Sequence, residues 1–483
     1  MRSDGGLLPA VAAACVVVAV LLAVQVAMDP NIEVTGSDSP FTDEGWLVLG
    51  ARNAVLLGRW ITDEWQLVIA QLPFNALAFV SFELFGVGII QARLVSVVAT
   101  VLAVAILGVV VGRRFGTAAG VLAALALGTA PLVLFYGRLA LLEATVMASL
   151  VATFAALLRR GDRTWIPGVL AGLAMAVALG TKPSAAAPIA GLLAGALLTG
   201  GALRPLLARR SALAVGVVAV MAAVWGIAVT AAGISIPDAL RPWPESDVIA
   251  PLDVLAGRAW HYLSGGNDLA TTTNTTLLIG SALGLIVIRH RWPALDAPQR
   301  TMVGAAIGWA VVGILVLLVV AYRPNRYVVP LLPPLAILTG VGGALLLATP
   351  RRAAASAALA LTLVVAVTAA GGAYLQRWMS IATYRLPQIQ DELARLLPEG
   401  AVTHGWFAST LAMRAPVTTI IAQGEVNRGD TYERYGVRWL ILERRGEPVD
   451  WIDEHPDAWE QRERVACYAW QRGETCVWHL PDT

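Results

Sequence analysis

The chain has little charge, and this scarcity defines its class. Only 14% of its 483 residues are charged, whereas 57% are hydrophobic, and the mean hydropathy is +0.68. Soluble domains carry about 25% charged residues, so the composition predicts an integral membrane protein surrounded by membrane lipids. The net charge of +2 gives no indication of a nucleic-acid partner.

Lysine is almost absent, and the common nucleotide-binding motifs are missing. A single lysine, Lys182, stands among 35 basic residues. It reflects either drift at a helix end or a specific need for an ammonium group. The chain has no P-loop and no Gly-rich dinucleotide fingerprint. It also lacks the Cys/His spacing of a metal site, so no cofactor is predicted with certainty, and a divalent cation stays an open alternative.

Long apolar runs predict a largely helical protein with many spans. A spanning helix needs about 20 apolar residues, and about eleven stretches meet this requirement. The stretches are 7–28, 91–112, 117–136, 142–158, 164–181, 184–200, 211–233, 272–288, 301–321, 327–348 and 353–373. The first has no small-residue cleavage site, which favours a retained helix over a signal peptide.

Arginine clusters fall in alternate loops and predict the orientation. They are Arg113-Arg114, Arg159-Arg160-Arg163, Arg204-Arg209-Arg210, Arg289-Arg291-Arg300 and Arg351-Arg352. Because positive loops stay cytoplasmic, we expect a multi-pass plasma-membrane protein in which 29–90 forms one long outer loop. The apolar run at 67–90 would invert every later cluster if it crossed the membrane, so it is predicted to form interfacial helices.

The composition changes near Tyr384, where the chain becomes charged. Helical and strand patterns then alternate, which predicts a small extracytoplasmic α/β domain over 384–483 after a transmembrane domain over 1–383. Cys467 and Cys476 flank a predicted hairpin turn. A disulfide between them would fit an oxidising compartment, although their spacing equally allows two free thiols.

Charged residues also interrupt the apolar sequence at span ends that are predicted to face outward. Ionisable groups at such positions are costly and often functional. They are Asp43, Glu44, Arg138, Glu143, Lys182, Arg323 and Arg326, followed by Tyr327. Each has a plainer interpretation: acidic residues open helices, arginines reach to the interface, and Arg138 can pair with Glu143. Gathered on one face, they favour a reaction site.

The residue types suit transfer of a sugar from a phosphate carrier. A carboxylate can take the proton of an acceptor hydroxyl or amine that attacks a sugar carbon, and Asp43 is the candidate base. Glu44 could assist it, or orient the acceptor or a metal. A phosphate leaving group needs cations, and Tyr327 could add a hydrogen bond. The candidate cations are Lys182, Arg323 and Arg326, to which Arg138 could add.

The order of these segments resembles the polyprenyl-phosphate-sugar-dependent GT-C glycosyltransferases. It is most similar to bacterial relatives of the dolichyl-phosphate-mannose protein mannosyltransferases and of the lipid A aminoarabinose transferase. The resembling pieces are Asp43-Glu44-Gly45-Trp46, Ala92-Arg93-Leu94-Val95-Ser96, Pro131 to Glu143, Lys182-Pro183 and Arg326 to Pro334.

The resemblance implies a GT-C-like fold and a polyprenyl-phosphate sugar donor, with inversion at the transferred sugar. It implies Asp43 as the base in the first outer loop, Glu143 as a second acidic residue, and Lys182, Arg323 and Arg326 near the lipid phosphate. The acceptor could be a lipid, a glycan or a protein. The segment 71–75 lacks the His-Pro-Pro of many relatives, and Glu143 stands where Asp is commoner, which affects the expected acceptor and metal need.

Two other function classes stay open at this point. A multi-span transporter or flippase of a lipid-linked sugar would place charged or broken helices near the bilayer midplane. The charges here lie at span ends, which favours the enzyme. A non-catalytic member that binds a lipid-linked sugar or scaffolds an envelope complex is the third alternative.

Overall fold

The structure is a computed structural model of the chain. It describes residues 6–31, 43–67, 71–161, 164–239, 268–320, 324–348, 369–421, 430–443, 456–470 and 473–481, together with Gly257, Ala366 and Asn427. Several of the predictions lie outside these residues: Arg163, Arg323, the Arg351-Arg352 cluster and most of the span at 353–373.

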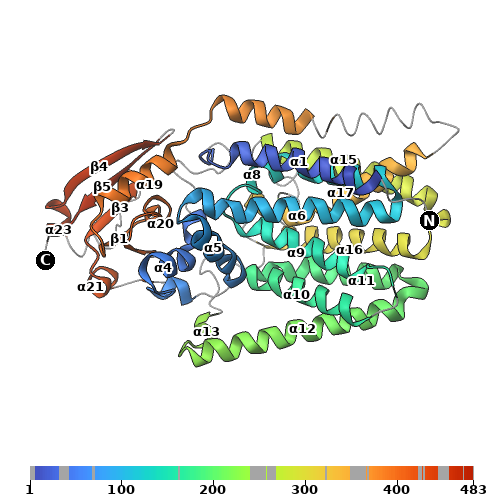
Figure 1. The fold of residues 1–483 in the computed structure, drawn as a ribbon, viewed down its shortest axis with the longest axis horizontal. Helices are drawn as coiled ribbons and strands as arrows, with labels where there is room; N and C mark the ends of the chain where they lie inside the picture. The colour runs from blue at the N-terminus through green and yellow to red at the C-terminus, as the bar shows by residue number, and fades with distance from the viewer. Residues whose placement is uncertain are drawn as a thin grey trace.

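A bundle of apolar helices forms most of the described chain, and Figure 1 shows these helices lying along the long axis of the molecule. They are α1 (Leu7–Gln25), α6 (Ile89–Phe115), α7 (Thr117–Gly128), α8 (Pro131–Tyr136), α9 (Leu142–Leu157), α10 (Trp165–Thr181), α11 (Ala186–Thr199), α12 (Arg204–Ala231), α15 (Asp268–Arg291), α16 (Ala297–Val319) and α17 (Leu332–Leu347). Ten of the predicted stretches correspond to these helices. Within the described residues, 5 helices are long and apolar enough to cross a membrane, and shorter apolar helices accompany them.

Proline residues break two apolar segments where the sequence places them. The predicted span at 117–136 is divided into α7 and α8, because Ala130 is extended before Pro131. Lys182 is extended in the same way before Pro183 and ends α10. The residue before a proline disfavours the helical conformation, which explains both breaks, although the prediction of one continuous span at 117–136 missed the first of them. The second break leaves the only lysine at a helix end.

Three of the arginine clusters, those at 113–114, 159–160 and 204–210, meet at one end of the bundle. Arg114 donates to the carbonyl of Leu158, and Arg160 donates to the carbonyl of Arg113. Arg210 donates to the carbonyls of Leu157, Arg159 and Gly161. Among the described residues, three of the clusters that charge parity assigns to one side therefore lie together. The starts of α6 and α9 and the end of α10 lie at the opposite end.

The first long loop forms short helices between the bundle and the C-terminal region (Figure 1). They are α3 (Asp43–Leu47), α4 (Leu49–Leu57), the 3-10 helix η2 (Glu64–Leu67) and α5 (Leu72–Phe85). Because α5 has 14 residues, it falls short of the roughly 20 that a spanning helix needs. This length agrees with the predicted interfacial position.

The C-terminal region, residues 384–483, contains a mixed sheet, in agreement with the predicted α/β pattern. Its elements are α19 (Arg385–Leu396), β1 (Val402–His404), α20 (Ala408–Leu411), β2 (Thr418–Ile420), α21 (Thr431–Tyr435), β3 (Trp439–Glu443), α23 (Pro456–Glu460), β4 (Glu463–Trp470) and β5 (Gly473–His479). The strand order is β2-β1-β3-β5-β4, with β1 parallel to both neighbours and β5 antiparallel to both of its own. A disulfide joins Cys467 and Cys476 across the β4–β5 hairpin.

A buried arginine fastens the C-terminal region to the first loop. Arg52 in α4 is fully buried and donates to the carbonyls of Ala412, Met413, Ala415 and Val417. Burial lowers the pKa of this guanidinium to about 9. Because a buried charge must be well hydrogen-bonded to be tolerated, these carbonyls fix α4 to the C-terminal region.

Candidate active site

Four charged side chains form a chain of ion pairs at the end of the bundle away from the arginine clusters. One oxygen of Asp43 lies 2.6 Å from Nη1 of Arg326. Nε of Arg326 lies 3.5 Å from Oε1 of Glu143, and Nζ of Lys182 lies 2.6 Å from that same oxygen. Acids and bases therefore alternate, and the formal charges of the four side chains cancel.

Each member of the cluster lies at the end of a helix. Asp43 opens α3, and Glu143 lies in the first turn of α9. Lys182 caps α10, while Arg326 follows Pro324 in the 3-10 helix η7 (Asn325–Leu331). Residues from four distant parts of the sequence thus meet at one end of the bundle.

Exposure increases across the cluster from Glu143, which is buried, to Asp43, which is partly exposed. The side chain of Glu143 is 2% exposed, those of Lys182 and Arg326 are each 14% exposed, and that of Asp43 is 21% exposed. The ammonium of Lys182 also lies 3.5 Å from the ring centre of Tyr327, which is close enough for a cation–π contact. Asp43 is therefore the carboxylate best placed to meet a reactant.

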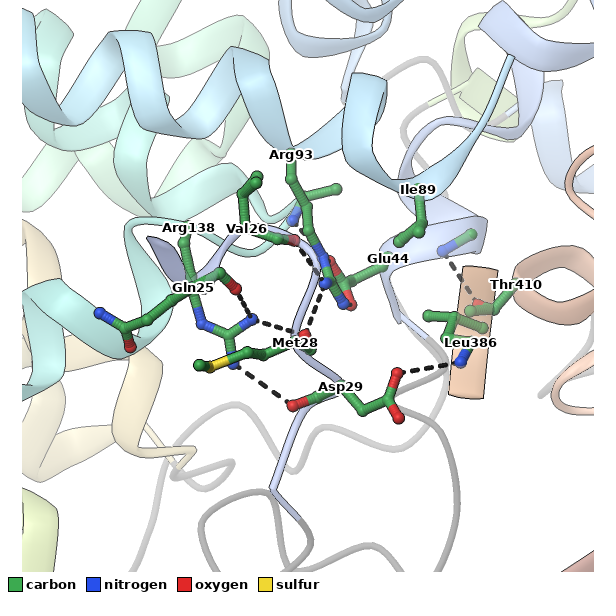
Figure 2. Close-up of polar contacts among 12 residues, drawn as sticks. Gln25, Val26, Met28, Asp29, Glu44, Ile89, Arg93, Arg138, Leu386 and Thr410 are labelled. Atoms are coloured by element: carbon green, nitrogen blue, oxygen red, sulfur yellow. Dashed lines mark hydrogen bonds and ion pairs between the residues drawn. The ribbon is translucent and has the colours of Figure 1, made fainter. Parts of the chain in front are cut away.

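A second ion pair lies beneath this cluster and is completely buried (Figure 2). Arg93 grips Glu44 with two hydrogen bonds, Nε to Oε1 and Nη2 to Oε2, each of 2.7 Å. The backbone N–H of Ala140 donates to Oε1 as well, at 2.8 Å. Such a bidentate pair fixes both direction and distance, so Glu44 holds α3 against the segment that precedes α9.

Arg93 and Arg138 extend this buried network to the end of α1. Arg93 donates to the carbonyls of Val26 and Met28, and Arg138 donates to those of Gln25 and Met28, as Figure 2 shows. Arg138 is fully buried. The network therefore connects the segments that carry Asp43 and Glu143, and its geometry favours a positioning role for Glu44, Arg93 and Arg138.

The structure brings together five of the residues selected from the sequence: Asp43, Glu143, Lys182, Arg326 and Tyr327. Glu44 and Arg138 belong to the buried network instead. The plainer interpretation paired Glu143 with Arg138. In the structure Glu143 pairs with Lys182 and Arg326 instead. Sequence reasoning assigned no role to Arg93, although an arginine inside an apolar run was a signal of functional or structural importance.

One group of three potential metal ligands occurs among the described residues. It consists of Cys467, Glu474 and Cys476. The two cysteines are joined in the disulfide, so they offer no thiolates to an ion.

Comparison with known proteins shows which proteins the chain resembles. Residues 73–227 match the family model described as dolichyl-phosphate-mannose-protein mannosyltransferase. No curated protein matches the sequence.

Solved structures share the fold over nearly the full chain. ArnT from Cupriavidus metallidurans bound to undecaprenyl phosphate is 19% identical, with 99% of this chain and 98% of that chain covered and a TM-score of 0.62. The archaeal oligosaccharyltransferase AglB from Archaeoglobus fulgidus, in complex with an inhibitory peptide and a dolichol-phosphate, is 12% identical (90% and 69% covered, TM-score 0.56). The mycobacterial arabinofuranosyltransferase AftD is 16% identical (100% and 40% covered, TM-score 0.56).

The chain therefore shares the fold of these membrane glycosyltransferases, and residues 73–227 resemble the mannosyltransferase family. This agrees with the resemblance stated from the sequence: the chain is similar in fold to ArnT and, over residues 73–227, to the dolichyl-phosphate-mannose-protein mannosyltransferases.

Proposed function

We propose that the protein transfers a sugar from a polyprenyl-phosphate carrier to an acceptor at the Asp43 cluster. The observation that supports this proposal is the chain of ion pairs Asp43–Arg326–Glu143–Lys182, which joins a partly exposed carboxylate to two cations. A base beside a pair of phosphate-binding cations is the combination that this reaction requires.

In the proposed reaction, an acceptor hydroxyl or amine attacks the anomeric carbon of the donor sugar. Asp43 takes the acceptor proton as the new bond forms. The bond between the anomeric carbon and the phosphate oxygen breaks with its electron pair, and the sugar inverts. Lys182 and Arg326 stabilise the charge that grows on the departing polyprenyl phosphate. Arg326 provides a planar fork and Lys182 a point charge.

The remaining sequence-selected residues have supporting roles in this proposal. Glu143 orients the two cations from the buried floor, and the Tyr327 hydroxyl donates to a phosphate oxygen. Glu44 assists Asp43 by fixing α3, with Arg93 and Arg138 as its partners. Arg323 lies outside the described residues, and its closeness in sequence to Arg326 supports a further phosphate contact.

We assign the cluster to the extracytoplasmic side of the plasma membrane. The arginine-rich loops gather at the other end of the bundle, and positive loops stay cytoplasmic. The Cys467–Cys476 disulfide lies in the β4–β5 hairpin of the C-terminal region, and an oxidising compartment would preserve it.

Turnover of labelled donors tests the proposal. Membranes that contain the protein receive polyprenyl-phosphate mannose, glucose or arabinose, each radiolabelled in the sugar, and release of label from the carrier is followed. We expect one donor to lose its label, and Lys182→Ala to raise the apparent KM for it. An unchanged donor KM in Lys182→Ala would remove this lysine from the phosphate site. Retention of label on every donor, despite measurable undecaprenyl phosphate binding, would contradict the reaction for these sugars.

A further inference from the structure

The C-terminal region packs directly on the short helix that carries Asp43. The backbone N–H of Gly45 donates to Oγ1 of Thr410 at 3.1 Å. A Cβ atom on Gly45 would lie 2.4 Å from the backbone nitrogen of Thr410, so only glycine allows this approach. The loop between β1 and α20 is consequently brought next to α3.

Three tryptophan rings follow one another across this contact. The ring centres of Trp65 and Trp46 lie 5.3 Å apart, and those of Trp46 and Trp406 lie 5.5 Å apart. Trp46 and Trp65 are each 6% exposed, whereas Trp406 is 52% exposed. Two buried rings thus support a third one that is open to the surroundings.

The backbone at Trp406 is fixed on both sides. Its carbonyl accepts a hydrogen bond of 3.1 Å from Nε1 of Trp46. Gly405 has a φ of +143°, and a Cβ there would lie 2.0 Å from the carbonyl oxygen of Ile441. Phe407 is buried. Trp406 is therefore an exposed aromatic side chain on a rigid support, not part of a loosely packed loop.

We propose that Trp406 is a stacking platform for a sugar ring of the acceptor, which makes the acceptor a glycan or a glycolipid. The inference rests on the proposed function. Asp43 and Trp46 are three residues apart on α3 and so share one side of the helix, and the ring of Trp406 packs against that of Trp46 at a tilt of 50°. Sugar rings present a face of C–H groups, and a rigid aromatic ring buries such a face at low entropic cost.

Binding of small glycosides tests the platform without requiring turnover. Protein in lipid nanodiscs is mixed with methyl α-mannopyranoside, methyl β-glucopyranoside or methyl β-galactopyranoside, and saturation-transfer difference NMR reports contact with the ring protons. We expect at least one glycoside to bind the wild type. Trp406→Ala should weaken that binding about fivefold, equivalent to about 1 kcal/mol, and Trp406→Phe should retain part of it.

Trp165 provides a matched control. It is 63% exposed and opens α10, whereas Lys182 ends that helix. It therefore lies at the end of the bundle opposite the cluster, and Trp165→Ala should leave glycoside binding unchanged. Equal loss in the two alanine variants would overturn the platform.

Undecaprenyl phosphate binding, measured in parallel, separates the two proposals. If wild type and Trp406→Ala bind this lipid equally while no glycoside binds the wild type, the platform is wrong and the proposed function stands. If the wild type fails to bind the lipid, the proposed function itself fails. Unchanged glycoside binding in Trp406→Ala would overturn the platform and leave Trp406 as an interfacial anchor.

Discussion

Replacement of Asp43 by asparagine should have two opposite effects: loss of sugar transfer and tighter binding of the carrier phosphate. In the structure Oδ2 of Asp43 lies 2.6 Å from Nη1 of Arg326. If Arg326 binds the donor phosphate, that phosphate competes with the Asp43 carboxylate for the same guanidinium. Asparagine has nearly the same shape but no charge, so it competes weakly. It also cannot accept the acceptor proton.

The size of the effect follows from the exposure of the pair. Two unit charges about 4 Å apart attract by about 4 kcal/mol at an effective dielectric constant of 20. Side-chain entropy and solvent reduce the net contribution of partly exposed pairs to about 1 kcal/mol. The Asp43 and Arg326 side chains are 21% and 14% exposed, so we use the lower figure. It corresponds to about fivefold tighter binding of undecaprenyl phosphate.

Binding is measured by microscale thermophoresis with undecaprenyl phosphate, which carries no sugar and cannot react. Asp391→Asn is the matched control, because Asp391 pairs with Arg414 in the C-terminal region, outside the cluster. This control should bind the lipid as the wild type does. A Kd that is unchanged or higher in Asp43→Asn would refute the competition for Arg326.

Three further predictions concern stability. Arg93→Met leaves Glu44 charged and buried, which should cost about 3–5 kcal/mol and lower the thermal midpoint in detergent; Arg93→Met with Glu44→Leu should recover part of that loss, and no recovery would contradict the pairing. Cys467→Ser removes the hairpin cross-link, which should lower unfolding free energy by about 2.5 kcal/mol, seen as faster proteolysis of the C-terminal region; equal rates would argue against the disulfide. Burial lowers the pKa of His404. As the pH decreases, the unfolded state therefore binds a proton at this histidine before the folded state does, and stability should fall below about pH 6.5. His404→Gln should flatten the pH dependence of urea unfolding, and an unchanged slope would show that this histidine does not cause that dependence.

The sequence was most informative where proline and charge coincide. Lys182 before Pro183 had to end a helix, and charge parity placed that end with Asp43, Glu143 and Arg326. The structure unites these residues. Their separation along the chain did not obscure the site, because each interrupts an apolar run and such interruptions are rarely accidental.

The buried network was beyond reach from the sequence. Glu44 and its neighbour Asp43 look equivalent as adjacent carboxylates, and only the fold shows that Glu44 turns inward to Arg93. Arg138 had the appearance of a site residue for the same reason, yet it donates to backbone carbonyls. Direction on a short helix depends on tertiary contacts that no local pattern encodes.

Short elements were also hard to predict. β1 has 3 residues, which is too few for an alternating pattern to stand out, although it lies centrally between β2 and β3. The break between α7 and α8 was hidden because apolar composition continues across it. Hydropathy records burial, whereas the backbone break depends on Pro131 alone.

The central claim is that Asp43 is the base for sugar transfer from a polyprenyl-phosphate donor. The most direct measurement is the single-turnover rate of transfer from a saturating radiolabelled donor, compared between wild type and Asp43→Asn in membranes with equal protein content. We predict transfer in the wild type and a loss of at least about a hundredfold in the variant, in line with general-base contributions. Transfer by Asp43→Asn at a rate close to wild type would contradict the account.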